Sequence, residues 1–297
     1  MNFQQVIETE KKMRNDGIDG AFTIDIPALV SVKGEPDLMM QVLRVTPSHR
    51  NMNYFYTEKY PKTQIMIHFT EGHLRGDLSQ LTKENQHVSV PFVIARDGGI
   101  YRLFGSEAWA FHVGKNPVGS TNEILSRSSI GIELSNYGPL TLQGNDLLTP
   151  YGDVYCSVND TSEYIKLPKP YRGKSYFASF TEEQYDALIV LLRYLTALFN
   201  IPRAFLPENV RYEATTQAVG FKGIVSHVNV RADKIDIGPA FDWAKVVAGV
   251  TAASYTSIAP ATRGFVAPLD SDSELDMDVD LSGVTRDFSI GDEEPDC

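Results

Sequence analysis

Cysteine is scarce in this chain, since only Cys156 and Cys297 occur in 297 residues and they lie far apart. Small secreted folds held by disulfides need several cysteines, so the stability of this protein is expected to come from a hydrophobic core. No apolar run is long enough to span a membrane, and the opening segment has acidic residues where a signal peptide would be apolar. We therefore expect neither a membrane span nor a signal peptide.

Basic charge is also limited, and its distribution is uneven. The formal net charge is -11, but residues 270–297 carry eleven acidic side chains against Arg286 alone, which leaves a nearly neutral body. A neutral body without a basic stripe argues against a nucleic-acid partner. The composition, 42% hydrophobic and 22% charged, is typical of a globular protein.

Residues 251–297 are expected to form a flexible acidic tail, because they are rich in Ala, Ser, Thr and Pro and then in acids. In the segment ELDMDVDLSG the acids alternate with apolar residues, which would give a one-sided strand if a partner protein supplied a sheet edge. The segment is not an EF-hand calcium loop, because Leu281 and Asp287 stand where that loop needs Gly and Glu.

The body alternates strand-like and helix-like segments. Residues 65–67 form a short apolar run suited to a strand buried on both faces, and His68 stands at its end. The segments SSIGIELSNYG and GIVS, at residues 128–138 and 223–226, are two further strands. Two β-rich runs around Asp97, Gly98 and Gly99 predict a hairpin.

Three helices are predicted in the same body. Residues 74–86 form a short one, and Thr181 and Gln184 have the capping-box spacing that opens the clearest one. The last helix is predicted to run from Pro239 to about Val250, with Gly238 in the capping position. Residues 138–178, rich in Gly, Pro, Tyr and Asp, are expected to form an irregular insertion.

The segment SHVNVRADKIDIGPAFDW, residues 226–243, concentrates groups that carry chemistry. His227, Lys234 and Asp236 bring an imidazole, an ammonium and a carboxylate into ten residues. A neutral imidazole and a carboxylate are usual zinc ligands, but a zinc site needs at least one more. The alternative is an ordinary polar histidine and a capping aspartate, and this segment alone leaves both readings open.

His68 is the natural third ligand. Of the six histidines, only His68 and His227 end predicted buried strands, where a rigid backbone can hold both rings toward one point. With Asp236 they make a three-ligand set that leaves a fourth position open, as in catalytic zinc sites. Hydrolysis also needs a proton shuttle and a cation near the oxyanion, and Glu133 and Lys234 are the candidates. The alternative for Glu133 is a solvent-facing strand residue.

Four motifs in register also carry a family resemblance. QIMIHFTEG, AWAFHVGKN, SSIGIELSNYG and SHVNVRADKIDIGPAFDW, in this order, resemble the type 2 N-acetylmuramoyl-L-alanine amidases, the family that includes the peptidoglycan recognition proteins and some phage lysozymes. The resemblance covers roughly residues 53–250. It divides the chain into an N-terminal extension at 1–52, a zinc amidase domain at 53–250 and the tail at 251–297.

The resemblance implies an α/β fold, in which helices pack on the faces of a central mixed β-sheet, and a zinc enzyme that cuts the amide between N-acetylmuramic acid and L-alanine. It assigns the Zn²⁺ ligands to His68, His227 and Asp236, the catalytic glutamate to Glu133 and the lysine near the oxyanion to Lys234. By the same resemblance, His112 and Trp109 contact the peptidoglycan or muropeptide substrate. The chain departs from the family at Pro91, where many members have His or Tyr, and in the separation of Trp109 from His112.

Other readings of the same motifs stay open. One is a module that binds peptidoglycan without cutting it, although such proteins typically lack the zinc donors that this chain keeps. Another is a structural protein of a phage particle with an amidase-like body. For the enzyme itself we expect synthesis in the bacterial cytoplasm and a phage-encoded lysin or virion component acting on the cell wall, with cytoplasmic wall recycling as the alternative.

Overall fold

A mixed sheet of eight strands carries the predicted site in the computed structural model, which describes residues 1–17, 20–25, 29–49 and 51–257. Across the sheet the order is β1 (Phe22–Asp25), β3 (Glu35–Pro47), β6 (Ile100–Arg102), β5 (Phe92–Ile94), β7 (Ser129–Leu134), β4 (Gln64–Phe69) and β13 (Gly223–Ser226), and β2 (Leu29–Val32) pairs with β3. Four neighbouring strands, β5, β7, β4 and β13, are parallel, whereas β6 is antiparallel to β5, and β1 and β2 are antiparallel to β3. The expected α/β class with a central mixed sheet is confirmed.

Helices cover both faces of this sheet. In β4, Ile65 and Ile67 face the cluster formed with α4 (Glu182–Leu198) and α5 (Trp243–Thr251). Met66 points the other way, into a cluster with Leu125 of α3 (Asn122–Ser128), and Leu78 of α2 (Leu74–Leu81) packs on the same side. Because side chains alternate along a strand, His68 belongs to the α3 side and not to the α4 side.

The predicted helix cap at Thr181 and the predicted hairpin turn at Asp97 to Gly99 are both confirmed. Thr181 caps α4, since its side chain accepts from the backbone N–H of Gln184 while the Gln184 side chain accepts from Thr181. The turn between β5 and β6 is closed by Gly99, whose N–H donates to Asp97 Oδ1 at 2.9 Å. These caps and turns depend only on near neighbours in the chain, which is why the sequence predicts them.

Two helix boundaries were wrong. Helix α5 begins at Trp243 and not at Pro239, because the Asp242 side chain accepts from the N–H of Lys245 at 2.9 Å and supplies the cap. Helix α2 ends at Leu81, since Thr82 closes it and donates its hydroxyl to the carbonyl of Leu78 at 2.7 Å.

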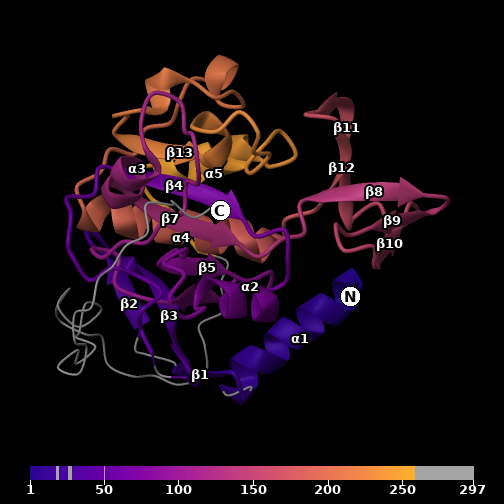
Figure 1. The fold of residues 1–297 in the computed structure, drawn as a ribbon, viewed down its shortest axis with the longest axis horizontal. Coiled ribbons are helices and arrows are strands. Elements are labelled where there is room, and N and C mark those ends of the chain that lie inside the picture. The colour runs from indigo at the N-terminus through magenta and orange to yellow at the C-terminus, as the bar shows by residue number, and fades with distance from the viewer. Residues whose placement is uncertain (18–19, 26–28, 50, 258–297) are drawn as a thin grey trace.

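The expected irregular insertion at 138–178 was also wrong, because this segment forms a second sheet that projects from one side of the main body (Figure 1). Its five antiparallel strands follow the order β10 (Val154–Ser157), β9 (Asp146–Leu148), β8 (Pro139–Gln143), β12 (Lys174–Ala178) and β11 (Tyr164–Tyr171). Leu140, Leu147 and Tyr155 bury one face of it against Val6 of α1 (Phe3–Asp16). The strands are short and separated by turns, so their composition resembles that of a loop.

The first 52 residues contribute strands to the main sheet. Residues of β1, β2 and β3 pair within it. One buried and one partly buried ion pair connect the segment to the rest. Arg96 donates its backbone N–H to Glu10 Oε2 at 2.6 Å and its Nη1 to Glu10 Oε1 at 3.2 Å. Arg193 of α4 donates its Nε to Glu35 Oε2 at 2.8 Å. The predicted boundary at residue 52 therefore does not coincide with an edge of the sheet.

Three 3-10 helices, η1 (Glu208–Val210), η2 (Thr216–Ala218) and η3 (His227–Asn229), lie between α4 and α5. None of the helices in the described ranges combines the length and the hydropathy of a membrane-spanning segment. Nearly all of the predicted acidic tail, including the alternating segment at 274–283, lies outside the described residues.

Candidate functional site

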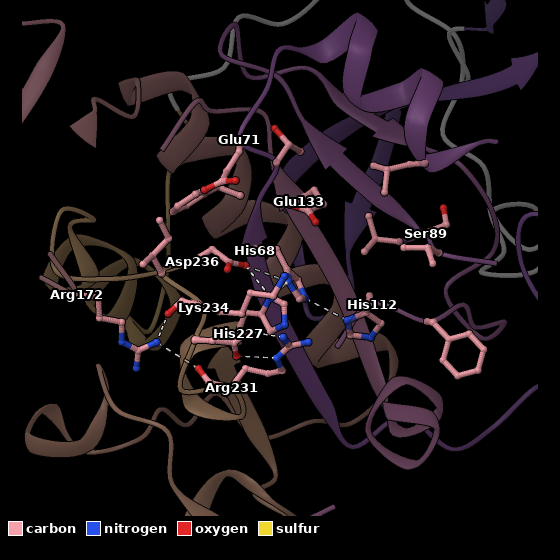
Figure 2. Close-up of a pocket in the computed structure, with 18 of the residues that line it drawn as sticks. His68, Glu71, Ser89, His112, Glu133, Arg172, His227, Arg231, Lys234 and Asp236 are labelled. Carbon is pink, nitrogen blue, oxygen red and sulfur yellow. Dashed lines mark hydrogen bonds and ion pairs between the residues drawn. The ribbon is translucent and has the colours of Figure 1, made fainter. Parts of the chain in front are cut away.

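The carboxyl ends of three adjacent parallel strands bring the predicted site residues together (Figure 2). His68 in β4 lies directly opposite Glu133 in β7, and Ser226, the last residue of β13, lies opposite Ile67. His227 follows Ser226 at once and so stands beside His68. Ile132 and Leu134 face the α4 side of the sheet, so Glu133 points to the opposite face, as predicted.

Three ligand atoms converge on one point. His68 Nδ1 lies 3.0 Å from His227 Nδ1 and 3.2 Å from Asp236 Oδ2, and His227 Nδ1 lies 2.9 Å from the same oxygen. Zinc bonds of about 2.0–2.1 Å in tetrahedral geometry separate neighbouring ligand atoms by roughly 3.3 Å, so this triangle fits zinc after shifts of a few tenths of an ångström. These three residues form a buried group able to hold a metal ion.

A chain of hydrogen bonds sets the tautomer of His68. The hydroxyl of Ser129 donates to the carbonyl of Leu125 at 2.6 Å, so Ser129 Oγ accepts from His112 Nε2, 3.0 Å away. The Nδ1 of a neutral His112 is then an acceptor, and the Nε2–H of His68 donates a hydrogen bond to it at 3.0 Å. This leaves a lone pair on His68 Nδ1, directed at the metal position.

A single hydrogen bond sets the tautomer of His227. Its Nε2 lies 2.7 Å from the carbonyl of Val113, which can only accept, so in the neutral ring the proton is on Nε2 and the lone pair on Nδ1. Two imidazole lone pairs and a carboxylate oxygen thus face one another. Such a group of acceptors is favourable only when a cation or a proton lies between them.

The protonation states suit this arrangement. Burial, and next the neighbouring His227, lower the pKa of His68 to about 4, so its ring is neutral at pH 7. Burial lowers the pKa of His112 well below its usual value as well. Burial alone would raise the pKa of Asp236, but in the metal-free protein a proton on the Nδ1 of His227 or His68 holds it below its usual range, and zinc would take the place of that proton. Neutral imidazoles and a charged carboxylate are the forms that bind zinc.

The glycine of β7 allows this packing. A Cβ at Gly131 would lie 2.5 Å from Val90 Cγ1 and 3.2 Å from the ring of His112, so any larger residue would push the ring away from His68. Gly131 therefore makes room for the hydrogen-bond chain on the face of the sheet that carries the site.

Glu133 and Lys234 line the same cavity of about 680 Å³ as the three ligand candidates. Oε2 of Glu133 is buried and has no hydrogen-bond partner among the described residues. Burial, and after it the charge of Asp236, raise the pKa of Glu133 well above its usual value. A carboxyl group with a raised pKa, facing the cavity beside the ligands, is suited to accepting and returning a proton.

The two predicted substrate contacts lie differently. His112 is buried and borders the cavity, but both of its ring nitrogens are engaged within the protein. Trp109 does not line the cavity: it is 4% exposed, stacks on Tyr56 with ring centroids 4.2 Å apart and lies under the guanidinium of Arg127. The structure therefore does not bring Trp109 to the site, because neighbouring side chains cover its ring.

Sequence reasoning missed five charged residues that line the cavity: Glu71, Arg172, Lys174, Arg231 and Asp233. Glu71 follows β4 in the left-handed region, at φ 56°, and burial, followed by the charge of Asp236, raises its pKa. Arg172 and Lys174 come from the turn of the second sheet. The pair Arg172 and Gly173 between two strand-like runs was a hairpin signal, but nothing in it indicated that the hairpin reaches the metal ligands.

Comparison with known proteins finds one matching family, described as N-acetylmuramoyl-L-alanine amidase, over residues 58–239. N-acetylmuramoyl-L-alanine amidase AmiD of Escherichia coli (strain K12) is 28% identical over 230 residues, which are 73% of this chain and 66% of that relative. The chain thus matches slightly less than two thirds of the relative's length.

Two solved structures are similar at lower identity. The complex of E. coli AmiD with the substrate anhydro-N-acetylmuramic acid-L-Ala-D-γ-Glu-L-Lys is 21% identical, with 75% of this chain and 65% of that chain covered and a TM-score of 0.43. AmpDH3 from Pseudomonas aeruginosa in complex with anhydromuramic pentapeptide is 16% identical, with 65% and 61% covered and a TM-score of 0.40.

Proposed function

The chain belongs to the N-acetylmuramoyl-L-alanine amidase family, and from this premise we propose that it is a zinc-dependent hydrolase of peptidoglycan. The bond cut is the amide between the lactyl group of N-acetylmuramic acid and L-alanine, in the intact wall or in soluble muropeptides. The observation that carries the proposal is the convergence of His68 Nδ1, His227 Nδ1 and Asp236 Oδ2 within 3.2 Å of one another, beside Glu133.

Each residue then has a chemical role. His68, His227 and Asp236 hold zinc, which when bound supplies the Lewis acidity that makes an amide carbonyl more electrophilic and water more acidic. Glu133 takes the proton of the attacking water on a carboxylate oxygen and returns it to the departing L-alanine nitrogen. Lys234, on the loop between His227 and Asp236, places its ammonium near the oxygen on which negative charge develops.

The proposal extends to the biological setting. We favour a phage-encoded lysin or a virion component that acts on the bacterial wall, because the second sheet and the N-terminal strands enlarge the body around the site. Cytoplasmic recycling of wall fragments is the alternative. The acidic tail is proposed as the attachment point for a partner protein.

Purified sacculi and muropeptides test the activity directly. The protein is incubated with each substrate, with and without a chelator, and the released ends are identified by mass spectrometry. New L-alanine amino termini that vanish with chelator and return with added zinc are expected. Binding to sacculi without release of any end would indicate a non-catalytic wall-binding protein, and release of other ends would refute the assigned bond.

A further inference from the structure

The hairpin turn between β11 and β12 reaches the metal site from a different sheet. Tyr171 pairs with Lys174, and the two residues between them, Arg172 and Gly173, have φ of 47° and 79°. Positive φ at both central positions is typical of a tight two-residue hairpin turn, in which Asn or Gly is usual at the first one. Arginine costs roughly 1–2 kcal/mol in this left-handed conformation, so compensating contacts of its side chain are expected.

Those contacts attach the turn to the loop that carries Lys234 and Asp236. Nη1 of Arg172 donates to the carbonyl of Arg231 at 3.2 Å and to the carbonyl of Lys234 (Figure 2). Tyr171 donates its hydroxyl to the carbonyl of Tyr212 at 2.8 Å. A Cβ at Gly238 would lie 2.6 Å from the Tyr171 ring, so the ring packs directly on the backbone two residues after Asp236. The turn is therefore held as a wall of the site.

The charges on this wall are not fully paired. Asp233, another cavity residue, already forms an ion pair with Arg231, and Asp236 faces the two imidazoles. Lys174 is exposed, lines the cavity and forms no ion pair among the described residues, although its charge lowers the pKa of Glu71.

Arg172 also keeps donors available. In the described part of the chain its hydrogen bonds use Nη1 alone, which leaves Nε and Nη2 for a ligand. A guanidinium and an ammonium that line the same cavity are suited to binding a carboxylate.

We propose that Lys174 and Arg172 form a carboxylate-binding subsite that selects an acidic peptide stem in the amidase substrate. The subsite rests on the proposed function, because it assigns the ligand of the same cavity. Arg172 also positions the loop with Lys234, whereas Lys174 contacts only the ligand. Lys174 is therefore the residue whose loss affects binding without disturbing the backbone of the site.

Matched muropeptides test this assignment. The parent is anhydro-N-acetylmuramic acid-L-Ala-D-γ-Glu-L-Lys, which has a free α-carboxylate on its glutamate and another at its C-terminus. Two analogues carry a carboxamide at one of these positions each. The dissociation constant is measured by calorimetry on chelator-treated protein, and KM and kcat on the zinc-loaded enzyme, for the wild type, Lys174→Ala and Lys174→Arg.

Lys174→Ala is expected to weaken binding of the parent about tenfold and to raise KM by a similar factor, with little change in kcat. One of the two carboxamide analogues should already bind more weakly to the wild type, and Lys174→Ala should cause no further loss of affinity for it. That analogue identifies the carboxylate that Lys174 binds. Lys174→Arg should restore binding. Lys166→Ala is the control, because Lys166 is exposed on the same hairpin and lies outside the cavity.

The outcomes separate the two proposals. Equal losses for the parent and both analogues, or no loss at all, would overturn the subsite even in an active enzyme. A wild type that hydrolyses neither these three peptides nor sacculi would refute the proposed function, while the binding measurements would still decide whether Lys174 binds a carboxylate of the peptide.

Discussion

Replacing His112 tests whether the hydrogen-bond chain behind His68 controls zinc binding. His112→Leu removes the acceptor of the Nε2 proton of His68, which lies 3.0 Å away, whereas His112→Asn has nearly the same size as Leu and keeps an oxygen in the place of Nδ1. The two variants therefore differ in the polar carboxamide of Asn, whose oxygen is the group that can accept from His68. Both positions are deeply buried, with His68 2% and His112 5% exposed, so water does not readily replace the lost partner.

The size of the effect follows from where the proton of His68 goes. In zinc-free His112→Leu the proton can move to Nδ1, where Asp236 Oδ2 accepts it at 3.2 Å. Zinc binding must return it to Nε2, which then has no acceptor, and a buried unsatisfied donor costs about 1–3 kcal/mol. We therefore expect zinc affinity to fall about 10–100-fold, the range found when residues that orient metal ligands are removed.

A competition titration with a chromophoric chelator at fixed pH measures this affinity, and thermal unfolding of the zinc-free variants shows whether they fold. His112→Asn should recover most of the affinity. Ser129→Ala should lose less than His112→Leu, because it removes only the more distant acceptor at 3.0 Å from His112. Equal affinities of His112→Leu and His112→Asn would refute the tautomer argument, and so would a wild-type affinity in His112→Leu.

Three further predictions concern catalysis, stability and pH. Glu133→Ala should lower kcat by at least about 100-fold while zinc, measured by metal analysis, remains bound; an active variant would remove Glu133 from the mechanism. Glu35→Ala leaves the buried guanidinium of Arg193 without its carboxylate and should lower the free energy of unfolding in urea by about 3 kcal/mol, whereas a loss under 1 kcal/mol would contradict this. Burial raises the pKa of Glu10 to about 7 although Arg96 opposes this, so the folded state binds an extra proton between pH 4.5 and 7. Stability should therefore fall as pH rises through that range, and Glu10→Gln should reduce the slope of melting temperature against pH; an unchanged slope would show that Glu10 does not cause it.

The site itself was largely predictable from the chain. His68 and His227 were recognisable because each directly follows a short run of apolar or small residues that reads as a strand, and Asp236 because it lies in a loop close to His227. The donor atoms that these side chains offer follow from the residue type and can be named without knowing the fold. The motifs in order around them carried the family, which the match over residues 58–239 now shows.

Three other features of the structure could not be predicted from residues close in the sequence. The β-strands of the second sheet lie among Gly, Pro and Tyr, so they resembled an irregular loop until their pairing partners were known. Trp109 was assigned to the substrate by its motif, yet its ring is covered by Tyr56 and Arg127, which lie far from it in the chain. The start of α5 was misplaced because Pro239 suits a first helical turn as well as it suits the loop that the chain forms there.

Local composition and spacing thus specified the central strands, the cap of α4 and the identity of the metal donors, since these depend on residue type and on residues a few positions apart. The meeting of His68 and His227, 159 positions apart, arises from the parallel pairing of β4 with β13. Packing across the sheet then selects which nitrogen of each ring faces the metal, and it brings the turn with Arg172 and Lys174 over the cavity. These features are collective: strand register and side-chain packing are settled by burial of the whole core, and no short segment encodes them alone.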